Sequence, residues 1–182
     1  MARVPYVERE DVPKEHRDLL VSSLQDRPLH VYRALGNNPE VLAGLQGFLS
    51  SLWSDSGLSD RRRELVILSV TREIGNEYEF HQHVNIARGV GIDDGTIAAV
   101  SRGEFDDLDD EEATLLRYAL AVVGGEVEDR DHDAITDHYD ESAVVGVAAL
   151  AEGYTALGGI IDALGVELEE EFVGWDPTAE SE

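Results

Sequence analysis

The spacing of apolar residues constrains the fold of this chain more than any other feature. Apolar side chains recur three and four positions apart in successive segments, and glycine, proline or a helix-capping residue separates one segment from the next. The clearest segments are residues 39–57, 59–75, 76–88, 109–122 and 142–164, and shorter ones are residues 13–24, 28–35, 93–100 and 131–139. No comparably long stretch alternates apolar and polar residues, as a half-buried strand would. The sequence therefore predicts an all-α fold.

Two of the long segments follow each other directly in the middle of the chain. Ser59 is a plausible N-cap for the first, and Gly75 ends it. The second begins at Asn76 and runs to Arg88, before two further glycines. Because the connection is so short, we expect the two helices to form a central antiparallel hairpin.

The length of 182 residues suits one globular domain with short tails. We expect an N-terminal helical extension over residues 1–27, a helical domain over residues 28–166 and a loose acidic tail over residues 167–182. Phe172 and Trp175 are the tail residues that could dock on the domain.

The charge is strongly acidic and is spread along the chain. Asp and Glu number 39 against 14 Lys and Arg, which gives a net charge of −25, and Lys14 is the single lysine. Such a surface repels nucleic acid and anionic membranes, so neither is an expected partner. Nearly complete loss of lysine with an excess of carboxylates favours a halophilic protein. We therefore expect stability to rise with salt, because screening relieves the repulsion.

The residue types present also exclude some chemistry. The chain has no cysteine, so it has no disulfide, zinc-thiolate site or thiol nucleophile. The first residues lack an apolar signal core, and no uninterrupted apolar run approaches the ~20 residues that span a bilayer. We expect a cytoplasmic protein.

One window differs in charge from the rest of the chain. Residues 61–88 hold five arginines and four glutamates, a local balance of 5 − 4 = +1. Arginines in such a window can simply pair with acidic neighbours. They can also form a cationic pocket for a small anionic substrate, because guanidinium groups bind carboxylates through two parallel hydrogen bonds.

Two carboxylate–imidazole pairs lie within the second hairpin helix. Glu79 and His83 are four residues apart and share one face, and Glu77 and His81 form a second pair about 160° away around the helix. At most one pair can face a pocket. A carboxylate can orient the imidazole and raise its pKa, which suits proton transfer near neutral pH. Alternatively, Glu79 completes a capping box that begins at Asn76.

The window resembles the core of the carboxymuconolactone decarboxylase family. The residues that carry the resemblance are Arg63-Glu64-Leu65-Val66-Ile67-Leu68, then Glu77-Tyr78-Glu79, His83 and Ala87-x-x-x-Gly91-Ile92. It is also similar to the alkylhydroperoxidase AhpD-like branch, in which a glutamate precedes Cys-x-x-Cys-x-x-x-His by twelve residues. Aligned on the histidine, Glu64 matches that glutamate, and Asn76 and Glu79 replace the cysteines. The resemblance covers about residues 30 to 125.

The resemblance implies an AhpD-like helical fold and a decarboxylase without metal or organic cofactor. It implies catalytic roles for His83 as proton donor and for Glu79 or Glu64 as its orienting partner. Tyr78, Arg63, Arg72 and Asn76 are the candidate substrate-binding residues. Phe80 stands where many relatives have tryptophan, which changes the expected pocket shape. Reduction of a peroxide by the thiol route is excluded, because that route needs two sulfurs.

Other functions remain open at this point. The chain could be a non-catalytic, small-molecule-binding member of the superfamily. A metal enzyme using His81, His83 and glutamates is a further alternative, although two rings about 200° apart around a helix cannot easily bind one ion. Large apolar stripes, together with the resemblance, lead us to expect a homotrimer or homohexamer.

Overall fold

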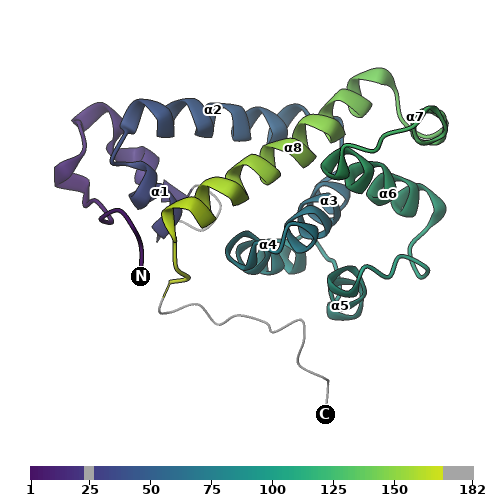
Figure 1. The fold of residues 1–182 in the computed structure, drawn as a ribbon, viewed down its shortest axis with the longest axis horizontal. Coiled ribbons are helices and arrows are strands. Elements are labelled where there is room, and N and C mark those ends of the chain that lie inside the picture. The colour runs from purple at the N-terminus through teal and green to yellow at the C-terminus, as the bar shows by residue number, and fades with distance from the viewer. Residues whose placement is uncertain (23–26, 170–182) are drawn as a thin grey trace, which may run out of the picture. The chain divides into compact units, whose positions relative to one another are not determined.

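A computed structural model describes residues 1–22 and 27–169, so Phe172 and Trp175 lie outside the described residues. The fold is all-α, as predicted, with 70% of the described residues in α- or 3₁₀-helices (Figure 1). The helices are α1 (His30–Leu35), α2 (Pro39–Asp55), α3 (Asp60–Glu73), α4 (Glu77–Gly89), α5 (Asp94–Arg102), α6 (Asp110–Gly124), α7 (Asp129–Thr136) and α8 (Glu141–Leu164).

The chain divides into two compact units. The described part of the first unit comprises residues 1–22, 27–51 and 159–169, and that of the second comprises residues 52–158. The predicted boundaries at residues 27 and 166 remain a prediction.

Helix α3 is the centre of the second unit. It contacts α4, α5 and α6, and Figure 1 shows α3 and α4 running alongside each other. Residues 63–71 are all buried, and the apolar run Leu65-Val66-Ile67-Leu68 has no exposed surface. A helix buried on every side places any polar residue it carries in the protein interior. Glu64 and Arg63 are such residues.

The hairpin forms because each helix is capped at its ends. The Ser59 hydroxyl accepts a hydrogen bond from the backbone N–H of Arg62, which starts α3. After α3, Gly75 adopts a left-handed φ of 68°, a conformation that costs glycine little. The Asn76 side chain then accepts from the backbone N–H of Glu79 and starts α4. The predicted caps and connection are therefore confirmed.

The N-terminal region differs from the prediction. Residues 13–24 were expected to form a helix, but Lys14–Leu20 is a 3₁₀-helix and Val21–Ser22 is a short strand, β1. Strand β1 pairs in antiparallel fashion with β2, Arg27–Pro28. Pro28 therefore lies in a strand, and α1 begins at His30. The segment between Pro13 and Pro28 is short for a helix that must be stable by itself. The pairing of β1 with β2 therefore outweighs its weak local preference for a helix.

The segment after α8 is held by the N-terminal residues. Arg3 donates to the carbonyls of Asp162 and Ala163, at 2.8 and 2.6 Å, which satisfies the exposed end of α8. The Tyr6 hydroxyl accepts from the backbone N–H of Glu167 at 3.0 Å. We predicted a loose tail from residue 167, but hydrogen bonds to Tyr6 and His30 hold Glu167 and Glu169.

Helix α8 is long and apolar enough to cross a membrane by length and composition alone. Within its 24 residues, an 18-residue window has a mean hydropathy of 1.6, but 56% of that window is buried in the protein. Glu152 and Asp162 interrupt its sequence. Val147 and Leu150 are fully buried, so the apolar character of the helix is used in the core.

Candidate functional site

The centre of the candidate site is His83, which lies between two carboxylates. Its Nδ1 is 2.8 Å from Glu64 Oε2, the distance of a short hydrogen bond. Its Nε2 is 3.6 Å from Glu79 Oε2, a close approach that is too long for a good hydrogen bond. Helix α3 supplies Glu64, and α4 supplies the other two residues. The three side chains lie together, whereas a substrate pocket at this position and their catalytic roles stay predictions.

The cluster is enclosed by protein. The exposed fractions of the side chains are 5% for His83, 0% for Glu64 and 6% for Glu79. Burial alone lowers the pKa of His83, but the charge and hydrogen bond of Glu64, together with the charge of Glu79, outweigh it. The pKa of His83 is therefore above its ordinary value. Because Nδ1 of His83 is bonded to the Glu64 carboxylate, Nε2 is the nitrogen that can exchange a proton with another group.

Arg63 is the guanidinium that belongs to this cluster. It stacks over the Trp53 ring at 3.9 Å and donates to the Trp53 carbonyl at 3.0 Å. It also pairs with Asp60 at 3.0 Å and approaches Glu64 Oε1 at 3.7 Å. Arg63 is thus held in place by the protein, and the charges of the cluster are nearly balanced.

Sequence reasoning missed two aromatic residues of the site. Trp53 Nε1 donates to the Tyr154 hydroxyl at 3.1 Å. The Tyr154 ring meets His83 edge-on with the ring centres 5.0 Å apart, and the Trp53 ring centre is 6.0 Å from that of His83. These two residues are 101 positions apart, so no local spacing connects them. Each looked like an ordinary member of an apolar helix stripe.

Three predicted substrate-binding residues take other places. Arg72 is a surface residue that donates to the Ser101 carbonyl and pairs with Glu73, so it is not part of the cluster. Both polar atoms of the Asn76 side chain serve the fold, because its oxygen caps α4 and its Nδ2 donates to the Gly158 carbonyl at 3.2 Å. Tyr78 is buried, but five positions along a helix turn it about 140° from His83. The structure therefore places Arg72 away from the cluster, whereas the substrate-binding roles of Asn76 and Tyr78 stay predictions.

The other arginines of the window support the structural interpretation of its charge. Arg61 forms a bidentate pair with Glu112, at 2.7 and 3.3 Å, and Arg62 pairs with Glu111. Both pairs join α3 to α6. The local excess of positive charge therefore stabilises helix packing, and Arg63 alone of the three adjacent arginines reaches the His83 cluster.

The second histidine of the window lies outside the cluster. His81 Nδ1 is 2.7 Å from the Glu77 carbonyl, one turn back on the same helix. In the described parts of the chain, no group of three or more His, Asp or Glu side chains is arranged to hold a metal ion.

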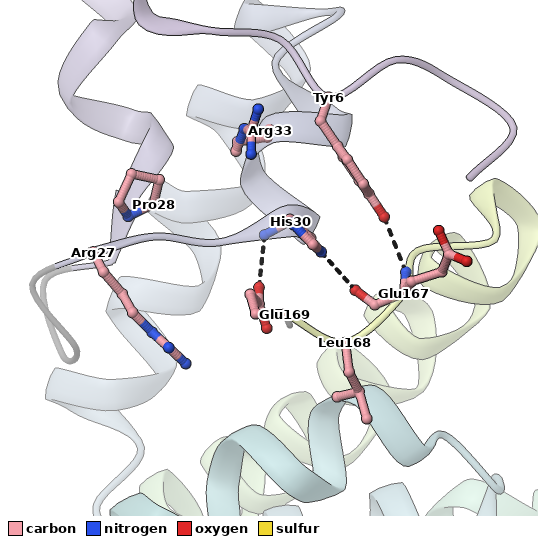
Figure 2. Close-up of a pocket in the computed structure, with 8 residues that line it drawn as sticks. All are labelled: Tyr6, Arg27, Pro28, His30, Arg33, Glu167, Leu168 and Glu169. Carbon is pink, nitrogen blue, oxygen red and sulfur yellow. Dashed lines mark hydrogen bonds between the residues drawn. The ribbon is translucent and has the colours of Figure 1, made fainter. Parts of the chain in front are cut away.

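A separate cavity of about 710 Å³ lies in the first unit. Its lining residues come from distant parts of the sequence: Tyr6, Arg27, Pro28, His30, Arg33, Glu167, Leu168 and Glu169. Figure 2 shows the Tyr6 hydroxyl and the His30 ring directed at the backbone of Glu167. The Tyr6 and His30 rings are stacked at 4.2 Å. Hydrogen bonds from Tyr6 and His30 to Glu167 and Glu169 thus use many of the polar groups that line the cavity.

Comparison with known structures identifies the fold. A peroxidase-related protein with an alkylhydroperoxidase AhpD core, from Ralstonia eutropha JMP134, matches with a TM-score of 0.85 and 20% identity over 94% of each chain. The debrominase Bmp8 matches with a TM-score of 0.77 and 17% identity over 92% of each chain. A putative antioxidant defence protein AhpD from Agrobacterium tumefaciens has a TM-score of 0.69 and 19% identity, and covers 75% of this chain and 96% of its own.

This all-α architecture is the AhpD-like fold. Residues 39–123 match the model of the carboxymuconolactone decarboxylase family, and this helical segment belongs to that family. The match includes the whole hairpin, with Glu64, Glu79 and His83. The match covers a little under half of the chain and supports the predicted family resemblance. None of the curated proteins matches the sequence significantly.

Proposed function

We propose that the protein is a cofactor-independent decarboxylase of 4-carboxymuconolactone or a related small unsaturated lactone acid. The observation that carries the proposal is the buried Glu64–His83–Glu79 array, with Glu64 on Nδ1 and Nε2 left to transfer a proton. The family match supports it, because the matched residues include all three side chains.

The proposed reaction asks little of the protein beyond acid–base chemistry. The bond between the ring carbon and the carboxylate breaks, CO₂ leaves, and the electron pair moves through the unsaturated lactone to its carbonyl oxygen. The imidazolium of His83 then gives its Nε2 proton to carbon and becomes neutral. The two carboxylates favour the protonated ring beforehand, which is the state a general acid needs.

The substrate contacts differ from those first expected. Arg72 lies on the surface, so Arg63 is the guanidinium we propose for contact with a substrate oxygen. Trp53 and Tyr154 would form an aromatic wall beside His83, which suits a flat conjugated ring.

The alternative is a non-catalytic protein that binds a small molecule. The enclosure of the cluster favours it, since none of the three side chains is more than 6% exposed and substrate needs a path to Nε2. A folded protein that binds a lactone acid without turnover would select this alternative.

The test follows CO₂ release from 4-carboxymuconolactone in molar salt with a chelator. His83→Gln should lower kcat/KM by about 10²- to 10⁴-fold, the usual loss for a positioned general acid. His81→Gln is the matched control, because this ring lies two residues away and bonds a backbone carbonyl. Equal rates in the parent and His83→Gln would remove the assigned role. Loss of activity on adding chelator alone would favour the metal alternative.

We further propose a cytoplasmic homotrimer or homohexamer. The family resemblance and the apolar stripes of the helices support the assembly. Analytical ultracentrifugation in molar salt tests it, and a monomer at micromolar concentration would contradict it.

A further inference from the structure

Two buried polar atoms next to His83 have no hydrogen-bonding partner among the described residues. They are Arg63 Nε and Glu64 Oε1, on side chains that are 5% and 0% exposed. The remaining contacts of these side chains are good: Glu64 Oε2 bonds His83, and Arg63 NH1 bonds the Trp53 carbonyl. Buried groups of this kind are nearly always satisfied, so an unpaired donor beside an unpaired acceptor calls for a partner.

The distance between the two atoms defines the partner's chemistry. At 3.7 Å they are too far apart to bond each other directly. An oxygen about 2.8–3.0 Å from each would complete the triangle. Arg63 Nε can only donate and an ionised carboxylate can only accept, so this oxygen must do both. A carbonyl oxygen would leave Glu64 unpaired, and an ammonium group would leave Arg63 unpaired.

We propose that Arg63 Nε and Glu64 Oε1 form a binding site for a single hydroxyl-type oxygen, supplied by water or by a hydroxyl or carboxylic acid group of the substrate. The site lies at Oε1 of Glu64, whereas His83 is bonded to Oε2 of the same carboxylate. Occupancy of the site is independent of the proposed decarboxylation. Only its contribution to catalysis, as a link from Arg63 through Glu64 to His83, rests on that function.

The surroundings of Arg63 oppose a simple closure of the gap. Its guanidinium is stacked on the Trp53 ring at 3.9 Å, and NH1 is bonded to both the Trp53 carbonyl and Asp60 at 3.0 Å. Turning Nε towards Glu64 would weaken these contacts. The stack and the two bonds therefore keep the donor and the acceptor apart at the separation that one oxygen bridges.

High-resolution crystal structures in molar salt test the proposal, without lactone acid and with it. Density for an oxygen within hydrogen-bonding distance of both atoms is expected. Such density in the ligand-free crystal identifies water, and density that appears only with lactone acid identifies a substrate group. A direct Nε–Oε1 hydrogen bond, or no density in either crystal, would overturn the proposal.

A solution experiment gives an independent readout. The Nε–H proton of Arg63 should show nuclear Overhauser or exchange cross-peaks to water or to the ligand hydroxyl. The signal should vanish in Arg63→Lys, which keeps the charge and removes Nε. Arg61→Lys is the matched control, since Arg61 pairs with Glu112 and should leave the signal unchanged. An Arg63 signal with cross-peaks only to protein protons would contradict the proposal. Turnover is measured separately, so failure of the decarboxylase assignment would not be confused with failure of the site.

Discussion

Two histidines of this protein are both held in place by hydrogen bonds, yet their surroundings give them different chemistry. His83 is in the interior, with one carboxylate on Nδ1 and another 3.6 Å from Nε2. His30 is half-buried at the wall of a cavity, stacked on Tyr6, with Nδ1 2.9 Å from the Glu167 carbonyl. A neutral carbonyl orients an imidazole, whereas buried carboxylates orient it and also favour its charged form.

The difference shows which features distinguish a candidate catalytic histidine from a structural one. Hydrogen bonding alone is common to both residues. Of the two rings, only His83 is enclosed beside two carboxylates, whose charges raise the pKa of that ring despite its burial. The His30 contacts instead join the start of α1 to the segment after α8, which is a role in connecting distant parts of the first unit.

Salt should produce the largest effect on stability and should act on the surface rather than on the buried cluster. With a net charge of −25, raising KCl from low to molar concentration should increase the Tm by about 10 °C. This rise corresponds to about 3 kcal/mol of relieved repulsion, at about 2–4 °C per kcal/mol in a chain of this size. Thermal melts of the parent and His83→Gln should rise in parallel, because buried pairs are screened little. A Tm that is constant or falls with salt would contradict the halophile prediction.

The next largest effect should come from the turn of the hairpin. Asn76→Ala removes the cap of α4 and the bond to the buried Gly158 carbonyl, so we expect a loss of about 2–3 kcal/mol in the free energy of unfolding. Asp93→Ala is the control, because Asp93 caps α5 on the exposed surface and has no buried carbonyl partner, so its loss of stability should be smaller. Urea unfolding measures both. Equal losses in the two variants would show that the hydrogen bond from Asn76 to the Gly158 carbonyl adds nothing to the free energy of unfolding.

The sequence predicts the hairpin well because its signals are local. Caps at Ser59 and Asn76 and the stop at Gly75 act within one helical turn. The pairing of His83 with Glu64 was also predictable, since the family pattern supplies the spacing across two helices. Both predictions depend on residues that are close in sequence or fixed by a known motif.

The remaining features depend on contacts that no local pattern contains. Trp53 reaches Tyr154 across 101 positions, and Tyr6 reaches Glu167 across 161. Arg63 and Arg72 looked equivalent in sequence, but nine positions along a helix correspond to about 900°, so they point in opposite directions. One turns to the core of the unit and the other to its surface.

The pH dependence of stability should reveal the charged state of His83. Its pKa is higher in the folded protein than its ordinary value of 6.5, so its contribution is complete below pH 6.5 and is lost as the pH rises through the folded pKa. Across that window, the free energy of unfolding of the parent relative to His83→Gln should fall by up to about 1.4 kcal/mol per pH unit. Urea unfolding in molar salt at several pH values measures this. A difference that stays flat or rises with pH would contradict the protonated imidazole on which the proposed proton transfer depends.

The smallest effect should come from the junction at His30 and Tyr6. Tyr6→Phe keeps the ring that stacks on His30 but removes the hydroxyl that accepts from the Glu167 N–H. Because one partly exposed hydrogen bond is lost, we expect a cost of about 0.5–1.5 kcal/mol in urea unfolding. The turnover rate with any lactone acid should remain within about twofold of the parent rate. Such a change corresponds to less than about 0.5 kcal/mol in the activation free energy. A Tyr6→Phe variant that keeps its stability but loses turnover would instead give the junction a functional role, and would break the distinction between the two histidines.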